Sequence, residues 1–179
     1  MPVRKTIDSP EIKEALTTMV ATLAERHGQT DSLIVVGIAD GGVELARRLT
    51  KLLDQALGRT LETGVVNVAF QRDDIGQNPI PKQAAATHLP ADVDNATVLL
   101  VDDVLSTGRT IRAAIEELFS IGRPGRVELA VLVDRGHHCL PFSADVAGFV
   151  EETDLSEDVV VNLNQNQPAD DRITITSRD

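Results

Sequence analysis

Near-continuous apolar runs alternate with amphipathic helical segments, and this alternation constrains the fold more than any other feature of the chain. The clearest runs are residues 33–38, 98–101 and 127–133. A strand that is apolar on both faces must be covered on both faces, which is typical of a parallel sheet with helices on each side. The pattern therefore predicts one doubly wound α/β domain over residues 1–179.

The periodicity also predicts where the individual elements lie. The first helix is expected between a cap at Asp8 or Ser9 and a stop at Gly28, and two more helices at 43–56 and 108–121. Strands are expected at 33–38, 64–70, 97–102, 127–133 and 145–149, with two short added strands at 159–163 and 173–175. The segment from Asp73 to Asn95 is polar and lacks a clear period, which favours a mobile lid over a passive surface excursion. The acidic stretches from Glu157 onward are expected to form a solvated face.

Composition excludes several classes of protein. The 17 Lys and Arg residues against 28 Asp and Glu give a net charge of −11, and there is no Trp or Tyr. A protein that coats nucleic acid needs cations for phosphates and aromatic rings for bases, so this class is excluded, although a local basic patch is not. The single cysteine excludes a disulfide framework and a cysteine-based zinc site. No apolar run is long enough for a membrane span and no signal peptide is evident, so a cytoplasmic protein without membrane association is expected.

The segment 98–110, VLLVDDVLSTGRT, is the most informative part of the sequence. It predicts an apolar strand, two carboxylates at its end, a small polar turn and then a helix. In an open parallel sheet, ligands bind outside the carboxyl ends of the strands. The turn at 106–110 offers main-chain N–H groups, hydroxyls and a guanidinium at a helix N-terminus, which suits an anion. Asp102 and Asp103 would repel that anion and suit hydroxyls or a metal. A sugar phosphate such as ribose 5-phosphate meets both demands; a Mg²⁺-binding corner and a simple helix cap are the alternatives.

This segment resembles the phosphoribosyl pyrophosphate (PRPP) binding motif of the type I phosphoribosyltransferases. More narrowly, the whole chain is similar to the PyrR type, the bifunctional pyrimidine-operon attenuation regulators and uracil phosphoribosyltransferases. The similarity runs in order through residues 36–38, 70–74, 98–110, 121–124 and 129–137. It implies the type I fold, with a mostly parallel central sheet flanked by helices, a flexible lid at about 73–95 and a small base-recognition hood at about 134–155.

The resemblance also implies a reaction: transfer of ribose 5-phosphate from PRPP to uracil, giving UMP and pyrophosphate. Mg²⁺ would be carried by PRPP, near Asp102 and Asp103, with no direct protein metal site. The implied roles fall into four groups. The catalytic residues are Asp102, Asp103 and Arg72. The PRPP and 5-phosphate residues are Asp102, Asp103, Ser106, Thr107, Gly108, Arg109 and Thr110. The pyrophosphate residues are Ala39, Asp40, Gly41, Gly42 and Arg72. The base-binding residues are Val133, Asp134, Arg135, Gly136 and His137, with main-chain groups reading the edge of uracil.

Two departures from the PyrR pattern leave alternatives open. Where such chains commonly carry Thr-Arg-Gly in the pyrophosphate loop, this chain has Asp40-Gly41-Gly42, which removes a cation and adds an acid. The first helix carries Glu11, Glu14 and Glu25 against Lys13 and Arg26, so attenuation by binding a leader RNA is a separate hypothesis. The alternatives are an RNA-binding attenuation regulator that senses UMP with little catalysis, and a phosphoribosyltransferase of purine specificity. The resemblance also implies a homodimer or a higher homo-oligomer.

Overall fold

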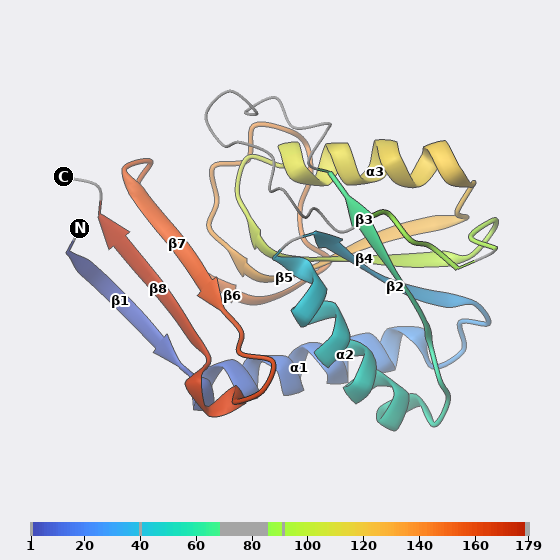
Figure 1. The fold of residues 1–179 in the computed structure, drawn as a ribbon, viewed down its shortest axis with the longest axis horizontal. Coiled ribbons are helices and arrows are strands. Elements are labelled where there is room, and N and C mark those ends of the chain that lie inside the picture. Colours follow the sequence, from blue (N-terminus) through green and yellow to red (C-terminus); the bar gives the residue numbers. More distant parts are fainter. Residues whose placement is uncertain (1, 40, 69–85, 91, 178–179) are drawn as a thin grey trace.

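The computed structural model describes residues 2–39, 41–68, 86–90 and 92–177. Its centre is a five-stranded sheet with the strand order β3-β2-β4-β5-β6, in which every neighbouring pair is parallel (Figure 1). The strands are β2 (Leu33–Ala39), β3 (Glu62–Asn67), β4 (Thr97–Leu105), β5 (Arg126–Asp134) and β6 (Val146–Val150). The predicted parallel α/β architecture is confirmed.

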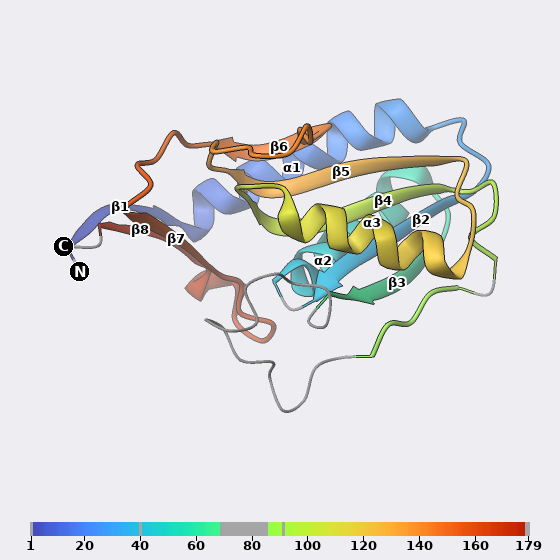
Figure 2. The ribbon, with the colours of Figure 1, turned by 90° about the horizontal axis from the view of Figure 1, so that it is seen from above.

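Helices cover both faces of this sheet, as the apolar strands require. The helices α1 (Ser9–His27) and α2 (Gly42–Leu57) lie on one face, and α3 (Arg109–Ile121) lies on the other (Figure 2). Side chains alternate between the two faces along a strand. In β4, Leu99 and Val101 accordingly pack with α1 and α2, whereas Val98 and Leu100 pack with α3. This alternation explains why the strands are apolar throughout.

A second, smaller sheet joins the two ends of the chain. It is antiparallel, with the strand order β1-β8-β7. Its strands are β1 (Val3–Asp8), β7 (Glu157–Asn162) and β8 (Arg172–Ser177). A short 3₁₀ helix, η1 (Pro168–Asp170), precedes β8. The strands β7 and β8 confirm the two predicted for the tail. The strand β1 was not predicted, because only Ile7 of its six residues is buried and no apolar pattern marks it. The segment 134–155, expected as a hood, contributes β6 to the parallel sheet.

The expectation that the acidic stretches of the tail form a solvated face is wrong for two residues. Glu157 and Asp171 are each only 5% exposed. Arg4 Nε lies 2.5 Å from Glu157 Oε1, and Arg48 of α2 forms an ion pair with Asp171. The Asp171 pair therefore holds the segment before β8 against α2, and the Glu157 pair links β7 to β1 within the small sheet, because a buried charge needs a partner of opposite sign.

Most of the predicted lid, residues 73–85 and 91, lies outside the described residues. The described remainder is attached to the body of the molecule. His88 and Val65 exchange two main-chain hydrogen bonds, of 2.7 and 2.8 Å, and the N–H of Asn67 donates to Thr87 Oγ1 at 3.0 Å. Val93 is buried in the core on the α3 side of the sheet.

Within the described part of the chain, no helix is both long and apolar enough to cross a bilayer.

Candidate active site

Three of the predicted functional segments meet at one edge of the parallel sheet. In the strand register, Gly37 of β2 lies opposite Val101 of β4, and Leu105 of β4 lies opposite Asp134 of β5. Parallel strands end at the same edge, so the loops after β2, β4 and β5 are neighbours there. The sequence predicted this convergence from the rule that ligands bind at the carboxyl ends of such strands.

The two adjacent carboxylates lie within β4 rather than after it. The strand was expected to end at Asp102, but its pairing with β5 continues to Leu105. Asp102 is 6% exposed, while Asp103 is half-buried. Because successive residues of a strand face opposite ways, Asp103 shares the side of Leu99 and Val101, toward α2. Burial raises the pKa of the Asp103 carboxyl, with nearby main-chain hydrogen bonds acting in the opposite direction.

Gly41 and Gly42 bring the start of α2 against the end of β4. A Cβ placed on Gly42 would lie 2.9 Å from Asp102 Cα and would overlap the carbonyl of Val101. A Cβ placed on Gly41 would lie 2.5 Å from Asp103 Oδ1. The N-terminus of a helix carries free N–H groups and a partial positive charge, so this contact sets an anion-attracting group beside the carboxylates. Ala39 ends β2 at the same place, while Asp40 and Arg72 lie outside the described residues.

The turn after β4 forms the second helix N-terminus of the site. Gly108 precedes α3 with a left-handed φ of 84°, a conformation that favours glycine. The N–H of Arg109 lies 3.4 Å from Thr107 Oγ1, and the Arg109 side chain is exposed. The predicted phosphate residues, Ser106, Thr107, Gly108, Arg109 and Thr110, therefore surround the first turn of α3, where main-chain N–H groups can bind an anion.

The loop after β5 has a main chain fixed by its own side chains. Gly136 and His137 both adopt left-handed φ values, 74° and 62°. The carboxylate of Asp134 accepts hydrogen bonds from the N–H of Gly136 at 3.0 Å and from His138 Nε2 at 2.8 Å. A left-handed φ is uncommon for a residue other than glycine, such as His137, and must be held in place by its surroundings. The two hydrogen bonds to Asp134, from the residues on either side of His137, hold the main chain in this shape.

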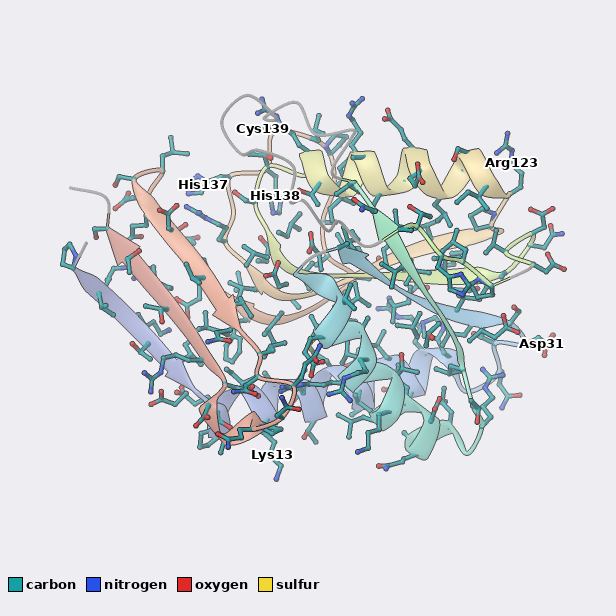
Figure 3. All side chains as sticks on the ribbon, in the orientation of Figure 1. Lys13, Asp31, Arg123, His137, His138 and Cys139 are labelled. Atoms are coloured by element: carbon teal, nitrogen blue, oxygen red, sulfur yellow. The ribbon has the colours of Figure 1, made fainter. Side chains whose placement is uncertain are left out.

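The side chains of Arg135 and His137 brace this loop against residues 153–157. Arg135 donates to Thr153 Oγ1 at 3.0 Å and to the carbonyls of Asp154 and Glu157 at 3.1 and 2.6 Å. His137 Nε2 donates to the carbonyl of Thr153 at 2.6 Å. Figure 3 shows His137 and His138 between β7 and the first turn of α3. With these nitrogens engaged, the groups that the loop offers to a ligand are chiefly main-chain N–H and C=O groups.

The loop after β5 is connected to the phosphate turn by contacts that the sequence did not predict. The carbonyl of Thr107 accepts hydrogen bonds from the N–H groups of Cys139 and Leu140, at 3.1 and 3.2 Å. A Cβ on Gly108 would lie 3.1 Å from the ring of Phe142, so this side chain packs over the turn. The apolar Leu140 and Phe142 in an otherwise polar loop were the available signal. The two loops consequently form one wall of the site.

The described residues contain no cluster of three or more His, Cys, Asp or Glu side chains that could hold a metal ion. Asp102 and Asp103 nevertheless offer carboxylate oxygens at the sheet edge. Mg²⁺ is commonly bound by one or two carboxylates together with substrate phosphates, and the donor set fits that mode.

The fold and the site together define a phosphoribosyltransferase. The family model described as phosphoribosyl transferase domain matches residues 5–163. Among solved structures, the chain is similar to hypoxanthine phosphoribosyltransferase of Trypanosoma cruzi, with a TM-score of 0.68 and 16% identity, covering 100% of this chain and 98% of that one. The Staphylococcus aureus hypoxanthine phosphoribosyltransferase gives a TM-score of 0.65 and 19% identity, covering 87% and 80%. These structural likenesses confirm the fold.

Curated relatives narrow the assignment. The bifunctional protein PyrR of Streptococcus mutans is 39% identical over 179 residues, covering 100% of this chain and 99% of the relative. That of Streptomyces coelicolor is 43% identical over 168 residues, covering 93% and 86%. The chain belongs to the PyrR family of phosphoribosyltransferases, as the sequence resemblance predicted.

Proposed function

We propose that this protein transfers ribose 5-phosphate from PRPP to uracil, producing UMP and pyrophosphate. One observation carries the proposal: Asp102 and Asp103 lie between the N-termini of α2 and α3 at a single sheet edge. PRPP is a vicinal diol with an anionic group on each side, and this arrangement offers hydrogen-bond acceptors between two anion sites.

Each part of the substrate then has a place. Asp102 and Asp103 accept hydrogen bonds from the ribose 2- and 3-hydroxyls. The residues of the turn at 106–110 bind the 5-phosphate through main-chain N–H groups. The pyrophosphate lies at the start of α2, over residues 39–42, with Arg72 contributing a cation. Main-chain groups of residues 133–137 read the edge of uracil.

The chemistry suits a site without a nucleophilic side chain. Breaking the bond between C1 and the pyrophosphate oxygen leaves an oxocarbenium-like ribose and a highly charged leaving group. The protein lowers the barrier by holding preorganised N–H groups and cations where that negative charge develops, and by excluding water. Mg²⁺ bound with PRPP would neutralise part of the pyrophosphate charge, and Asp102 and Asp103 are the residues that would face it.

A base-specificity assay tests the proposal. Purified protein is incubated with PRPP and Mg²⁺ and, separately, uracil, guanine and orotate, and nucleotide formation is followed spectrophotometrically. We expect UMP from uracil. Turnover of guanine without turnover of uracil would instead assign the protein to the purine-specific alternative. Arg112→Gln, an exposed change on α3, serves as the control variant and should retain the parent rate.

A second candidate function is RNA-binding regulation that responds to UMP, in the cytoplasm. The PyrR resemblance favours it, whereas the acidic residues of α1 oppose it. Electrophoretic mobility of a pyrimidine-operon leader hairpin, with and without UMP, tests it. A UMP-dependent shift supports the regulator, and unchanged mobility rejects it. Sedimentation of the same preparation tests for the homodimer or higher oligomer that we expect.

A further inference from the structure

A groove of about 400 Å³ lies between α1 and α2, away from the sheet edge that carries the candidate site. Leu16, Leu52 and Pro168 supply its apolar surface, and Lys13, Arg47 and Lys51 supply cationic groups. The segment around η1 closes one side, where Ser9 Oγ donates to the carbonyl of Pro168 at 2.7 Å. The groove is therefore built by three separate parts of the chain.

The charges of this groove are unusual for so acidic a protein. Arg48 lines its base and is neutralised by Glu44 and Asp171, while Arg47 pairs with Glu44. Two exposed ammonium groups remain, those of Lys13 and Lys51, and neither forms an ion pair with a carboxylate of the described residues. The chain has 28 acidic and 17 basic residues, so most exposed cations would be expected to form an ion pair with a carboxylate, and two lysines of one groove that lack such a partner among the described residues are therefore unusual.

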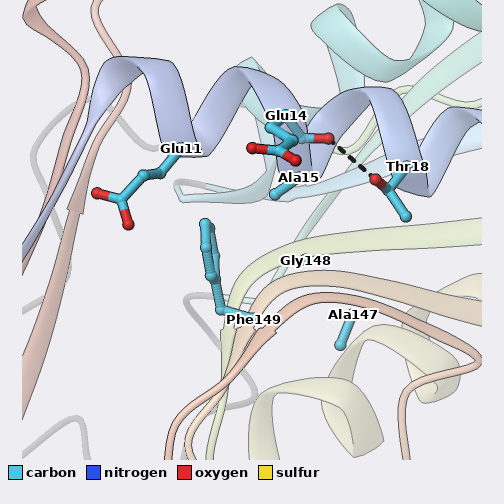
Figure 4. A pocket seen from close by; sticks show the side chains of 7 residues that line it. All are labelled: Glu11, Glu14, Ala15, Thr18, Ala147, Gly148 and Phe149. Carbon is cyan, nitrogen blue, oxygen red and sulfur yellow. Dashed lines mark hydrogen bonds between the residues drawn. The ribbon is translucent and has the colours of Figure 1, made fainter.

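The opposite flank of α1 has the reverse character. There a pocket of about 260 Å³ is lined by Glu11, Glu14 and Thr18 of α1 together with residues 147–149 of β6 (Figure 4). An anion that approaches α1 is repelled on this flank and attracted on the flank that carries Lys13. Figure 3 shows Lys13 projecting outward from α1.

We propose that the groove between α1 and α2 binds a nucleotide with more than one phosphate. Its flat base would pack on the apolar surface of Leu16, Leu52 and Pro168, and its phosphates would accept charge-assisted hydrogen bonds from Lys13, Arg47 and Lys51. The volume lies in the range of small-molecule sites. The groove takes residues from the middle of α2, whereas the proposed pyrophosphate site lies at its N-terminus.

Calorimetric titration of the full chain with UTP and with ATP tests this site, with UMP present in excess to fill the candidate active site. We expect binding of at least one triphosphate, and a loss of about tenfold in affinity for each lysine removed in the Lys13→Gln and Lys51→Gln variants. Arg112→Gln removes an exposed cation from the opposite face of the sheet and should leave the affinity unchanged. Amide NMR shifts confined to α1, residues 47–52 of α2 and the η1 segment, with none at residues 41–42, would locate the ligand in the groove rather than in the candidate active site.

Three results would overturn the assignment: no heat with either triphosphate, equal affinity in the parent and in the double lysine variant, or tighter binding of oligouridylate than of UTP. UMP formation is measured on the same preparations and should be equal in all of them, because neither lysine belongs to the candidate active site. An absence of UMP formation would count against the proposed enzyme while leaving the NMR result on the groove intact.

Discussion

Gly41 and Gly42 are adjacent, yet their substitution by alanine should have different consequences. A methyl group at Gly42 meets the main chain of β4, which cannot move without disturbing the sheet, so Gly42→Ala should lower the free energy of unfolding by about 1–3 kcal/mol. A methyl group at Gly41 meets only the carboxylate of Asp103, which can rotate away. Gly41→Ala should therefore keep the parent stability but raise the KM for PRPP. Urea denaturation and initial rates measure both; equal loss of stability in the two variants would contradict this.

Asp103 should contribute to activity at the expense of stability. Replacing it with Asn removes a charged hydrogen-bond acceptor for the ribose diol, so turnover should fall by about tenfold to a hundredfold. Burial raises the pKa of this carboxyl in the folded state, so the folded protein loses stability as the pH rises from the ordinary aspartate pKa through the raised one. At neutral pH, Asp103→Asn should thus be more stable than the parent, as urea denaturation would show. A less stable Asn variant would contradict the stated cost of burial.

At the scale of elements, Arg48 connects α2 to the small sheet. Its side chain is 11% exposed, contacts Glu44 and Asp171, and donates to the carbonyl of Asn164 at 2.8 Å. Arg48→Ala leaves the buried Asp171 carboxylate without its ion-pair partner, while Glu44 keeps Arg47, so the free energy of unfolding should fall by about 3 kcal/mol. Arg112→Ala breaks a pair with Glu116 in which both side chains are 52% exposed, and should cost about 0.5 kcal/mol or less. Chemical denaturation of the two variants gives the comparison, and similar losses would contradict it.

The end of α1 is packed against β5 through a buried His27 and Glu128, each 2% exposed, with His27 Nε2 3.3 Å from Glu128 Oε2. Burial lowers the pKa of His27, although Glu128 acts in the opposite direction. The folded state therefore prefers neutral His27, and stability should fall as the pH drops below the ordinary histidine pKa of about 6.5, where the unfolded chain gains a proton. His27→Gln should remove this part of the pH dependence of the urea midpoint. An unchanged slope would show that another group titrates there.

The elements that sequence reasoning predicted are those whose packing leaves a periodic trace. The helix α1 and the strands β2, β4 and β5 each bury a repeated apolar pattern, so their positions follow from the sequence alone. The strand β1 leaves no such trace, because its hydrogen bonds to β8 depend on residues at the other end of the chain. The same reason applies to Glu157 and Asp171, whose burial requires the distant Arg4 and Arg48.

At the scale of the whole molecule, the sequence predicted which segments meet at the sheet edge but not the hydrogen bonds that connect them. The parallel sheet brings the ends of β2, β4 and β5 to one edge, and the motif at 98–110 places acids and a helix start there. The connections of Thr107 to the loop after β5, and of Arg135 to residues 153–157, join segments with no shared pattern. Such contacts follow from tertiary packing, which local periodicity does not encode.

The net charge of −11 makes a final prediction about RNA. Affinity for RNA of arbitrary sequence depends mainly on cations that neutralise phosphates, and this chain has a large excess of acids. A scrambled hairpin should therefore show no mobility shift at physiological salt, so any shift with a leader hairpin would report specific recognition. Reversing charge on one flank of α1, with Glu11→Lys and Glu14→Lys, should strengthen binding of both hairpins by about tenfold or more, since each new cation can neutralise a phosphate. A gain confined to the leader hairpin would instead mean that this flank reads sequence rather than charge.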